Sequence, residues 1–160
     1  MPTPVPTHRV LLATLLALPL LVAGPAHAQD AADPAPWPPV ATFSILGYDP
    51  ATGEIGGAVQ SRVFSVGNGV LWGEAGVGMV ATQAIVDVSY GPQGLDLLEL
   101  GYAPEVVVQT ILAADPDPDP ERWTVEGRQF SVMDAEGNVA THTGTRSSAW
   151  AGHVIGENVS

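Results

Sequence analysis

Residues 42–67 read TFSILGYDPATGEIGGAVQSRVFSVG and carry the strongest structural signal in the chain. Apolar and polar side chains alternate over 42–48, which is the pattern of a β-strand with one buried face. Residues 49–54 (DPATGE) combine Pro, which presets φ, with Gly, which accepts a positive φ. The chain then returns over 55–62, where two adjacent glycines allow another backbone to approach closely. The stretch therefore predicts a β-hairpin.

The rest of the chain predicts more strands, with two helices between them. We expect these strands in residues 70–72 (a short strand or a buried turn within the Gly-punctuated bend 64–74), 76–86, 128–134 and 139–143. Residues 89–92 (SYGP) predict a helix entry, with Ser or Tyr near the cap and Pro in the first turn, and apolar residues at helical spacing continue this helix over 93–100. A second helix is predicted over 103–112, again with Pro in its first turn. This order favours an α+β fold, in which layered sheets carry helices over one face.

The first 28 residues have the composition of an export signal. Arg9 precedes an apolar run at 10–24, and the small residues of 26–28 (AHA) predict cleavage after Ala28. The alternative is a membrane anchor, but this run is short against the about 20 residues that a spanning helix needs. We expect a secreted or periplasmic protein with no membrane span after signal removal. Residues 29–41 (QDAADPAPWPPVA) then form a Pro-rich linker, and 42–160 form the domain.

Charge and cysteine content narrow the classes of partner. The chain has 17 acidic and 5 basic residues, none of them Lys, so loss of Arg9 with the signal leaves 4 − 17 = −13. Binding to a phosphate backbone needs clustered cations, so nucleic acid is not an expected partner. The absence of Cys excludes disulfides and thiolate metal sites. A small-molecule or peptide substrate, and a second copy of the chain, remain as partners.

Three patterns in the sequence resemble metal or phosphate sites but lack the spacing that such sites need. The tract 115–120 (DPDPDP) points its carboxylates apart and lacks the Gly turn and final Glu of a calcium loop, so we expect a solvated loop. His142 and His153, even with Asp134, match no compact zinc spacing and are better interpreted as hydrogen-bonded structural residues. The glycines of 73–78 precede no helix N-terminus that could hold phosphate. We therefore expect no metal and no cofactor.

Several runs resemble one known family. They are 58–62 (AVQSR), 76–84 (GVGMVATQA), 89–94 (SYGPQG), 142–144 (HTG) and 150–153 (WAGH). Their order resembles the bacterial family filed as domain of unknown function 1028, which is assigned to the N-terminal-nucleophile (Ntn) hydrolase superfamily. The resemblance implies a four-layer αββα sandwich, whereas periodicity alone supports only α+β. It also implies that the domain continues past Ser160, so we expect a truncated domain in which 156–160 begins another strand.

The resemblance makes Thr42 the candidate nucleophile. An N-terminal Thr attacks a carbonyl with its hydroxyl while its own α-amine takes the proton, so no His base is needed. Signal cleavage leaves 29–41 ahead of Thr42, so a second cut between Ala41 and Thr42 is required. The alternative is an ordinary Thr at the start of a strand.

Ser61 and Arg62 would, by resemblance, orient the hydroxyl and the amine of Thr42. The superfamily's proteasome branch has an Asp where this chain has Gln60, and it uses a Lys that this chain lacks. These departures weaken a proteasome-like mechanism and leave one that uses only the amine. The alternative role for Arg62 is a surface ion pair.

Amide and hydroxyl groups are the candidates for substrate binding. The expected binding residues are Gln60, Thr82, Gln83 and Ser89. The alternative is that such polar groups on buried strands satisfy one another. The sequence thus favours a secreted hydrolase that cuts a peptide or cell-wall-derived amide. The alternative is a non-catalytic envelope binding or scaffold domain with the same fold.

Overall fold

The computed structural model describes residues 42–117, 119–121, 124–148 and 151–160. The predicted signal (1–28), the linker (29–41) and Trp150 lie outside the described residues. Within the ranges described, no helix has both the length and the apolar character needed to cross a membrane.

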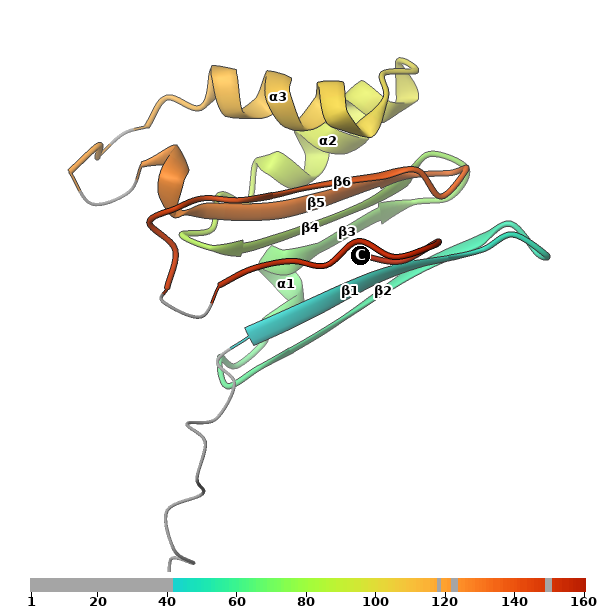
Figure 1. Ribbon diagram of the computed structural model, residues 1–160, viewed down its shortest axis with the longest axis horizontal. Helices are drawn as coiled ribbons and strands as arrows, with labels where there is room; N and C mark the ends of the chain where they lie inside the picture. Colours follow the sequence, from blue (N-terminus) through green and yellow to red (C-terminus); the bar gives the residue numbers. More distant parts are fainter. Residues whose placement is uncertain (1–41, 118, 122–123, 149–150) are drawn as a thin grey trace, which may run out of the picture. The chain divides into compact units, whose positions relative to one another are not determined.

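The described chain is a mixed α and β structure with two antiparallel sheets (Figure 1). The first sheet is the hairpin of β1 (Thr42–Asp49) and β2 (Glu54–Ser61). The second sheet has the order β3-β4-β5-β6, with β3 (Leu71–Glu74), β4 (Gly78–Ala84), β5 (Arg128–Asp134) and β6 (Val139–Thr143). The helices are α1 (Gly67–Val70), α2 (Tyr90–Glu99) and α3 (Pro104–Ala114), with a 3-10 turn η1 (Val125–Gly127).

The predicted hairpins, strands and two longer helices are confirmed, with differences at their ends. The predicted strand 76–86 stops at Ala84, because Ala84 adopts a φ of 64° that an extended strand cannot continue through. The first long helix begins at Tyr90 with Ser89 as its N-cap, which confirms the helix entry predicted at residues 89–92. The bend expected at 64–74 contains the short helix α1.

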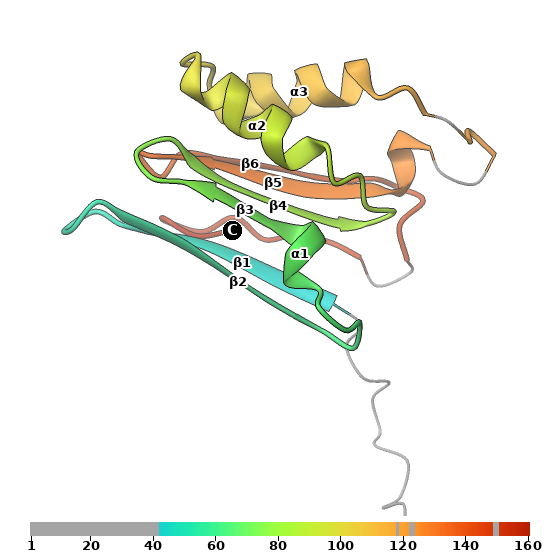
Figure 2. The ribbon, with the colours of Figure 1, turned by 180° about the vertical axis from the view of Figure 1, so that it is seen from behind.

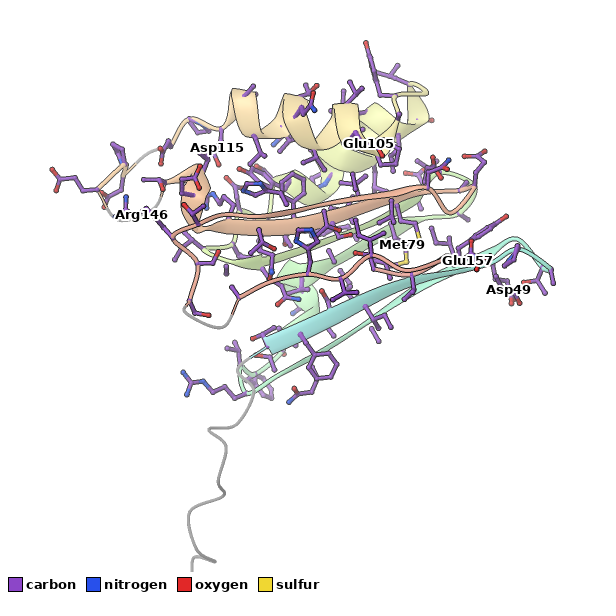
Figure 3. The ribbon with its side chains drawn as sticks, in the orientation of Figure 1. Asp49, Met79, Glu105, Asp115, Arg146 and Glu157 are labelled. Atoms are coloured by element: carbon purple, nitrogen blue, oxygen red, sulfur yellow. The ribbon has the colours of Figure 1, made fainter. Side chains whose placement is uncertain are left out.

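Helices α2 and α3 lie against one face of the four-stranded sheet, and the β1–β2 hairpin lies against the other face (Figures 1 and 2). Side chains on β4 alternate between these faces, so Val80 packs on the helices while Met79 and Ala81 pack toward the hairpin. The core under the helices contains Val80, Tyr90, Leu98, Val107, Val108, Ile111, Phe130, Val132 and Ala140. A smaller cluster of Leu46, Ala81 and Met133 joins the two sheets, and Met79, which is labelled in Figure 3, packs against it.

The segment at 156–160 runs along the edge of β1 that β2 leaves open (Figure 1). Leu46 N–H donates to the carbonyl of Ser160 at 2.8 Å, and Ser160 N–H donates back to Leu46 at 3.0 Å. The segment that we expected to begin a strand thus pairs with β1, through a bridge between Gly47 and Val159.

The outer face of the hairpin is open to solvent. Phe43 and Ile45 point away from the four-stranded sheet and are 53% and 47% exposed. A four-layer sandwich would cover this face with a second helical layer, and no such layer occurs among the residues that the structure describes.

Close packing at Gly91 docks α2 onto the sheet and yields a first prediction. A Cβ added at Gly91 would lie 2.2 Å from Cγ of Trp72 on β3. Gly91→Ala should therefore lower the free energy of unfolding by about 1–3 kcal/mol, although Ala favours helix formation. Gly67→Ala in α1 is the matched control, because nothing lies within 4 Å of its added Cβ. Urea unfolding of both variants tests this, and equal stabilities would contradict the packing described.

Candidate functional site

A pair of hydroxyl groups closes the open end of the β1–β2 hairpin. Thr42 begins β1 and stands directly opposite Ser61, the last residue of β2, so both side chains face the same side of the sheet. Their hydroxyl oxygens lie 2.8 Å apart. Ser61 Oγ also accepts the backbone N–H of Val63 at 3.0 Å, which fixes this hydroxyl beside Thr42.

A groove of about 820 Å³ lies between the two sheets, and we call it the inter-sheet groove. Its lining residues from the strands are Thr42, Phe43, Ser44, Ile45, Leu46, Ala81, Gln83, Gln129, Phe130, Ser131 and Thr141. The rest of its wall comes from the C-terminal segment, at Ala151, Gly152, His153, Val154, Gly156, Val159 and Ser160. The candidate nucleophile Thr42 therefore borders a space large enough for a small ligand.

A second space, of about 340 Å³, lies beside the first, and we call it the apolar pocket. It is lined by Thr42, Ser61, Val63, Phe64, Ser65, Val66, Gly69, Val70, Gln83, Ala84 and Val86. Thr42 and Gln83 line both spaces. Thr42 is thus accessible from two sides.

Two residues of the apolar pocket have left-handed backbones. Ser65, in the turn before α1, has a φ of 55°, and Ala84, at the end of β4, has a φ of 64°. Each such residue costs on the order of 1–3 kcal/mol and persists only where surrounding structure holds it, as happens at functional sites. The pocket wall is therefore held in shape by the rest of the fold.

Side-chain hydrogen bonds connect the walls of the inter-sheet groove. Gln83 Nε2 on β4 donates to Ser44 Oγ on β1, which links the two sheets. Ser131 Oγ lies 2.7 Å from Thr141 Oγ1, and the hydroxyl of Ser160 lies 2.8 Å from that of Thr141. Among the described residues, no Asp, Glu or Arg lines either space. The site is thus suited to uncharged ligands that exchange hydrogen bonds.

His153 lines the inter-sheet groove and is the one residue with an imidazole that does so in the described part of the chain. Its Nδ1 lies 2.9 Å from Thr143 Oγ1, and Gln129 Nε2 donates to the same hydroxyl at 2.9 Å. His142 Nε2 lies 3.4 Å from the carbonyl of Val125. Both histidines are hydrogen-bonded, as the sequence predicts.

Of the predicted site residues, Thr42, Ser61 and Gln83 lie together. Arg62 is exposed, lines neither space and forms no ion pair with any residue that the structure describes. Gln60 stands opposite Phe43 and faces the outer side of the hairpin, because its neighbour Ser61 faces inward. The structure does not bring Arg62 and Gln60 to the walls around Thr42.

The other two predicted binding residues also lie away from Thr42. Thr82 is 1% exposed, and its hydroxyl donates to the carbonyl of Gly69 at 2.7 Å, so it holds α1 against β4. Ser89 precedes α2, where its hydroxyl donates to Asp87 at 2.7 Å and accepts from Gln93 at 2.8 Å. Both hydroxyls satisfy local partners, which is the alternative that the sequence left open.

A buried ionic cluster joins the start of α2, the end of α3 and the start of β5. Arg128 is 3% exposed, and its Nε donates to Asp115 Oδ2 at 3.0 Å. The hydroxyl of Tyr90 also donates to Asp115 Oδ2, and Arg128 Nη1 donates to the carbonyl of Ile85 at 2.8 Å. Asp87 lies 3.7 Å from Arg128 Nη2. Figure 3 shows Asp115 beyond the end of α3.

The cluster corrects the interpretation of 115–120 as a solvated loop at its first residue, Asp115. The side chain of Asp115 is fully buried, because Arg128 and Tyr90 replace its hydration with hydrogen bonds. No spacing pattern in the sequence predicts the pair of Asp115 and Arg128, since the two residues lie 13 positions apart and η1 lies between them.

Asp115 and Arg128 both stay ionised in this cluster. Burial alone would raise the pKa of Asp115, but hydrogen bonds from Tyr90 and Arg128 outweigh burial and hold that pKa below its ordinary value. Burial opposes the charge on Arg128, yet Asp115 raises the pKa of the guanidinium overall. Burial, and then the bond to Asp115, raise the pKa of Tyr90 well above its ordinary value. The cluster is therefore an ion pair with a neutral tyrosine.

The described residues hold no group of three or more His, Cys, Asp or Glu side chains that could bind a metal ion. The chemistry that the site itself offers comes from hydroxyls, amides and one imidazole.

Comparison with known proteins identifies relatives of this chain. The model of DUF1028, described as a family of unknown function, matches residues 42–160. The crystal structure of protein SPO2555 from Silicibacter pomeroyi, of the same family, is similar with a TM-score of 0.67 and 34% sequence identity. The match covers 74% of this chain and 52% of that one, so this chain spans about half the length of that protein. No curated protein matches.

Proposed function

Because this chain belongs to the DUF1028 family, whose function is unknown, we propose a function from its own site. The protein is an exported hydrolase of the Ntn kind that cuts an amide bond with Thr42 as its nucleophile. Its complete fold is the four-layer αββα sandwich, of which α2, α3 and the two sheets form three layers. The export signal is 1–28.

One observation carries this proposal: the hydroxyls of Thr42 and Ser61 lie 2.8 Å apart where the hairpin borders both spaces. A nucleophile needs a rigid support and a partner that aims its hydroxyl. Thr42 has a rigid support because it is the first residue of β1, and Ser61 is the partner that aims its hydroxyl. The uncharged walls exclude competing ions from the reacting centre.

The proposed reaction needs the α-amine of Thr42 to be free. Cleavage of the bond between Ala41 and Thr42 converts an amide nitrogen, which cannot accept a proton, into an amine with an ordinary pKa of about 8. The amine takes the hydroxyl proton as Oγ1 attacks the substrate carbonyl, and the C–N bond breaks as the proton passes to the leaving amine. Water then hydrolyses the ester on Thr42 and releases a carboxylic acid.

Ser61 is a positioning residue in this proposal, since it contacts Thr42 Oγ1 and is itself fixed by Val63. Gln83 lines both spaces, and the amide hydrogen that does not bond Ser44 can be donated to a substrate carbonyl. Arg62 is left without a catalytic role, since it is exposed and lines neither space.

A non-catalytic binding domain is the second candidate. It is favoured by the bond between Thr42 and Ser61, which also serves as an ordinary cross-strand contact that closes a hairpin. The inter-sheet groove would then hold a ligand without any cut before Thr42.

The N-terminal residue of the mature protein separates these candidates. If the protein is a hydrolase of this kind, N-terminal sequencing of active protein from its own host should read Thr-Phe-Ser-Ile, beginning at Thr42. Active preparations that begin at Gln29 would exclude Thr42 as an N-terminal nucleophile and would leave the binding domain as the better proposal.

A further inference from the structure

Apolar side chains surround the apolar pocket and remain in water. Val63, Phe64 and Val86 are 60%, 95% and 40% exposed, and all three line this one pocket. Leaving apolar area in water forgoes about 25 cal/mol per Å². Single exposed apolar residues are ordinary, but a group of them around one concavity indicates a binding surface.

The floor of the pocket is apolar as well. Val70 is 5% exposed, Val66 is half-buried, and Ala84 contributes only a methyl group. The volume of about 340 Å³ falls at the small end of the range for ligand pockets, about 300–1,000 Å³. Such a space holds one side chain or ring of a ligand.

Polar groups converge on one wall of this pocket. The hydroxyls of Thr42 and Ser61 and the amide of Gln83 line it, and no Asp, Glu or Arg among the described residues does so. A charged group that entered would lose its hydration and gain no counter-ion, which is strongly unfavourable. An uncharged apolar group would instead cover the exposed valines and Phe64.

We propose that the apolar pocket is the specificity subsite of this protein and takes an uncharged apolar side chain carried next to an amide carbonyl. The apolar side chain enters among Val63, Val66 and Val86, and the carbonyl lies at the hydroxyls of Thr42 and Ser61. The substrate class is therefore an N-acylated amide or a peptide with a branched aliphatic or phenyl side chain at that position. This inference rests on the proposed function for the reaction that follows binding, but the binding itself does not need turnover.

The test compares two small probes on one protein that cannot react. Full-length Thr42→Val keeps the volume of the residue and removes its hydroxyl. N-acetyl-leucine amide and N-acetyl-glutamate amide are titrated into it, and the valine methyl signals are followed by NMR. The leucine probe should shift signals of Val63, Val66 and Val86, and the glutamate probe should bind at least 10-fold more weakly.

A matched pair of variants tests whether the leucine probe binds in the apolar pocket. Val86→Asp puts a carboxylate in the pocket and should weaken binding of the leucine probe at least 10-fold. Val106→Asp makes the same change at a valine of α3 that is 43% exposed and lines neither space, and should leave binding unchanged. Thermal unfolding of both variants checks that they remain folded.

The outcomes separate the subsite from the reaction. Equal binding of the two probes, or shifts confined to valines outside the pocket, would overturn the subsite, and neither comparison depends on the Val86→Asp variant. Selective binding of the leucine probe to a protein that begins at Thr42 and hydrolyses no amide would uphold the subsite and sink the proposed function. Hydrolysis with no preference between leucine and glutamate amides would support the proposed function and overturn the subsite.

Discussion

Thr42→Ala should abolish amide hydrolysis together with any self-cleavage before Thr42, whereas Thr42→Ser should keep part of both. Removal of a nucleophile that acts with its own base reduces kcat by on the order of 10⁶-fold. Ser retains the hydroxyl and the amine but lacks the methyl group that fixes the rotamer, so its loss should be much smaller. Single-turnover assays and intact-mass measurement of the N-terminus would record both effects.

Stability should barely change in these variants. Thr42→Ala removes one side-chain hydrogen bond, that to Ser61, which is worth about 1 kcal/mol. Thr110→Ala is the matched control, because Thr110 is exposed on α3 and lines neither space. Full activity of a folded Thr42→Ala protein would exclude the proposed nucleophile, and an equal loss in Thr110→Ala would point to a general defect.

Arg128→Met should reduce the free energy of unfolding by about 3–5 kcal/mol, the scale for removing one partner of a buried ion pair. The substitution leaves the buried carboxylate of Asp115 without its cation and removes the donor that satisfies the carbonyl of Ile85. Arg146→Met is the control, since Arg146 is exposed and its side chain donates only to the carbonyl of Glu121 among the described residues. Denaturant unfolding should show a change below about 1 kcal/mol for it.

The same ion pair sets a pH dependence. The folded pKa of Asp115 is lowered below its unfolded value, so its contribution to stability is present above about pH 4 and is lost as pH falls through the folded pKa. The native protein should therefore lose stability below about pH 4 more steeply than Asp115→Asn, which has no such carboxylate to protonate. Parallel slopes for the two proteins in acid would show that Asp115 is not paired in solution.

The hairpins and most strand positions could be predicted because their signals are local. Alternation and turn residues over 42–62 define β1 and β2 without any distant contact. The end of β4 could not be predicted, since Ala84 has no intrinsic preference for the left-handed conformation that it adopts. The next residue, Ile85, is bonded to distant parts of the chain: its carbonyl accepts from Arg128 Nη1, and its N–H donates to the carbonyl of Gly127.

The site could be predicted where residues sit opposite each other on a hairpin, as Thr42 and Ser61 do. It could not be predicted where the face of a strand decides the outcome. Thr82 and Gln83 are neighbours with similar polarity, yet one faces the helices and the other faces the hairpin. Composition alone does not say which of two adjacent polar residues points into a groove.

The path of the chain between β4 and β5 has a consequence for the order of folding. These two central strands are neighbours in the sheet, but residues 85–127, with α2 and α3, separate them. The entropy lost in bringing two strands together grows with the length of the intervening chain. We therefore expect the hairpins β1–β2 and β5–β6, each joined by a short turn, to form before the β4–β5 pair, which requires the helices to condense. The groove beside Thr42 should consequently assemble late, because its opposite walls belong to β1 and β5.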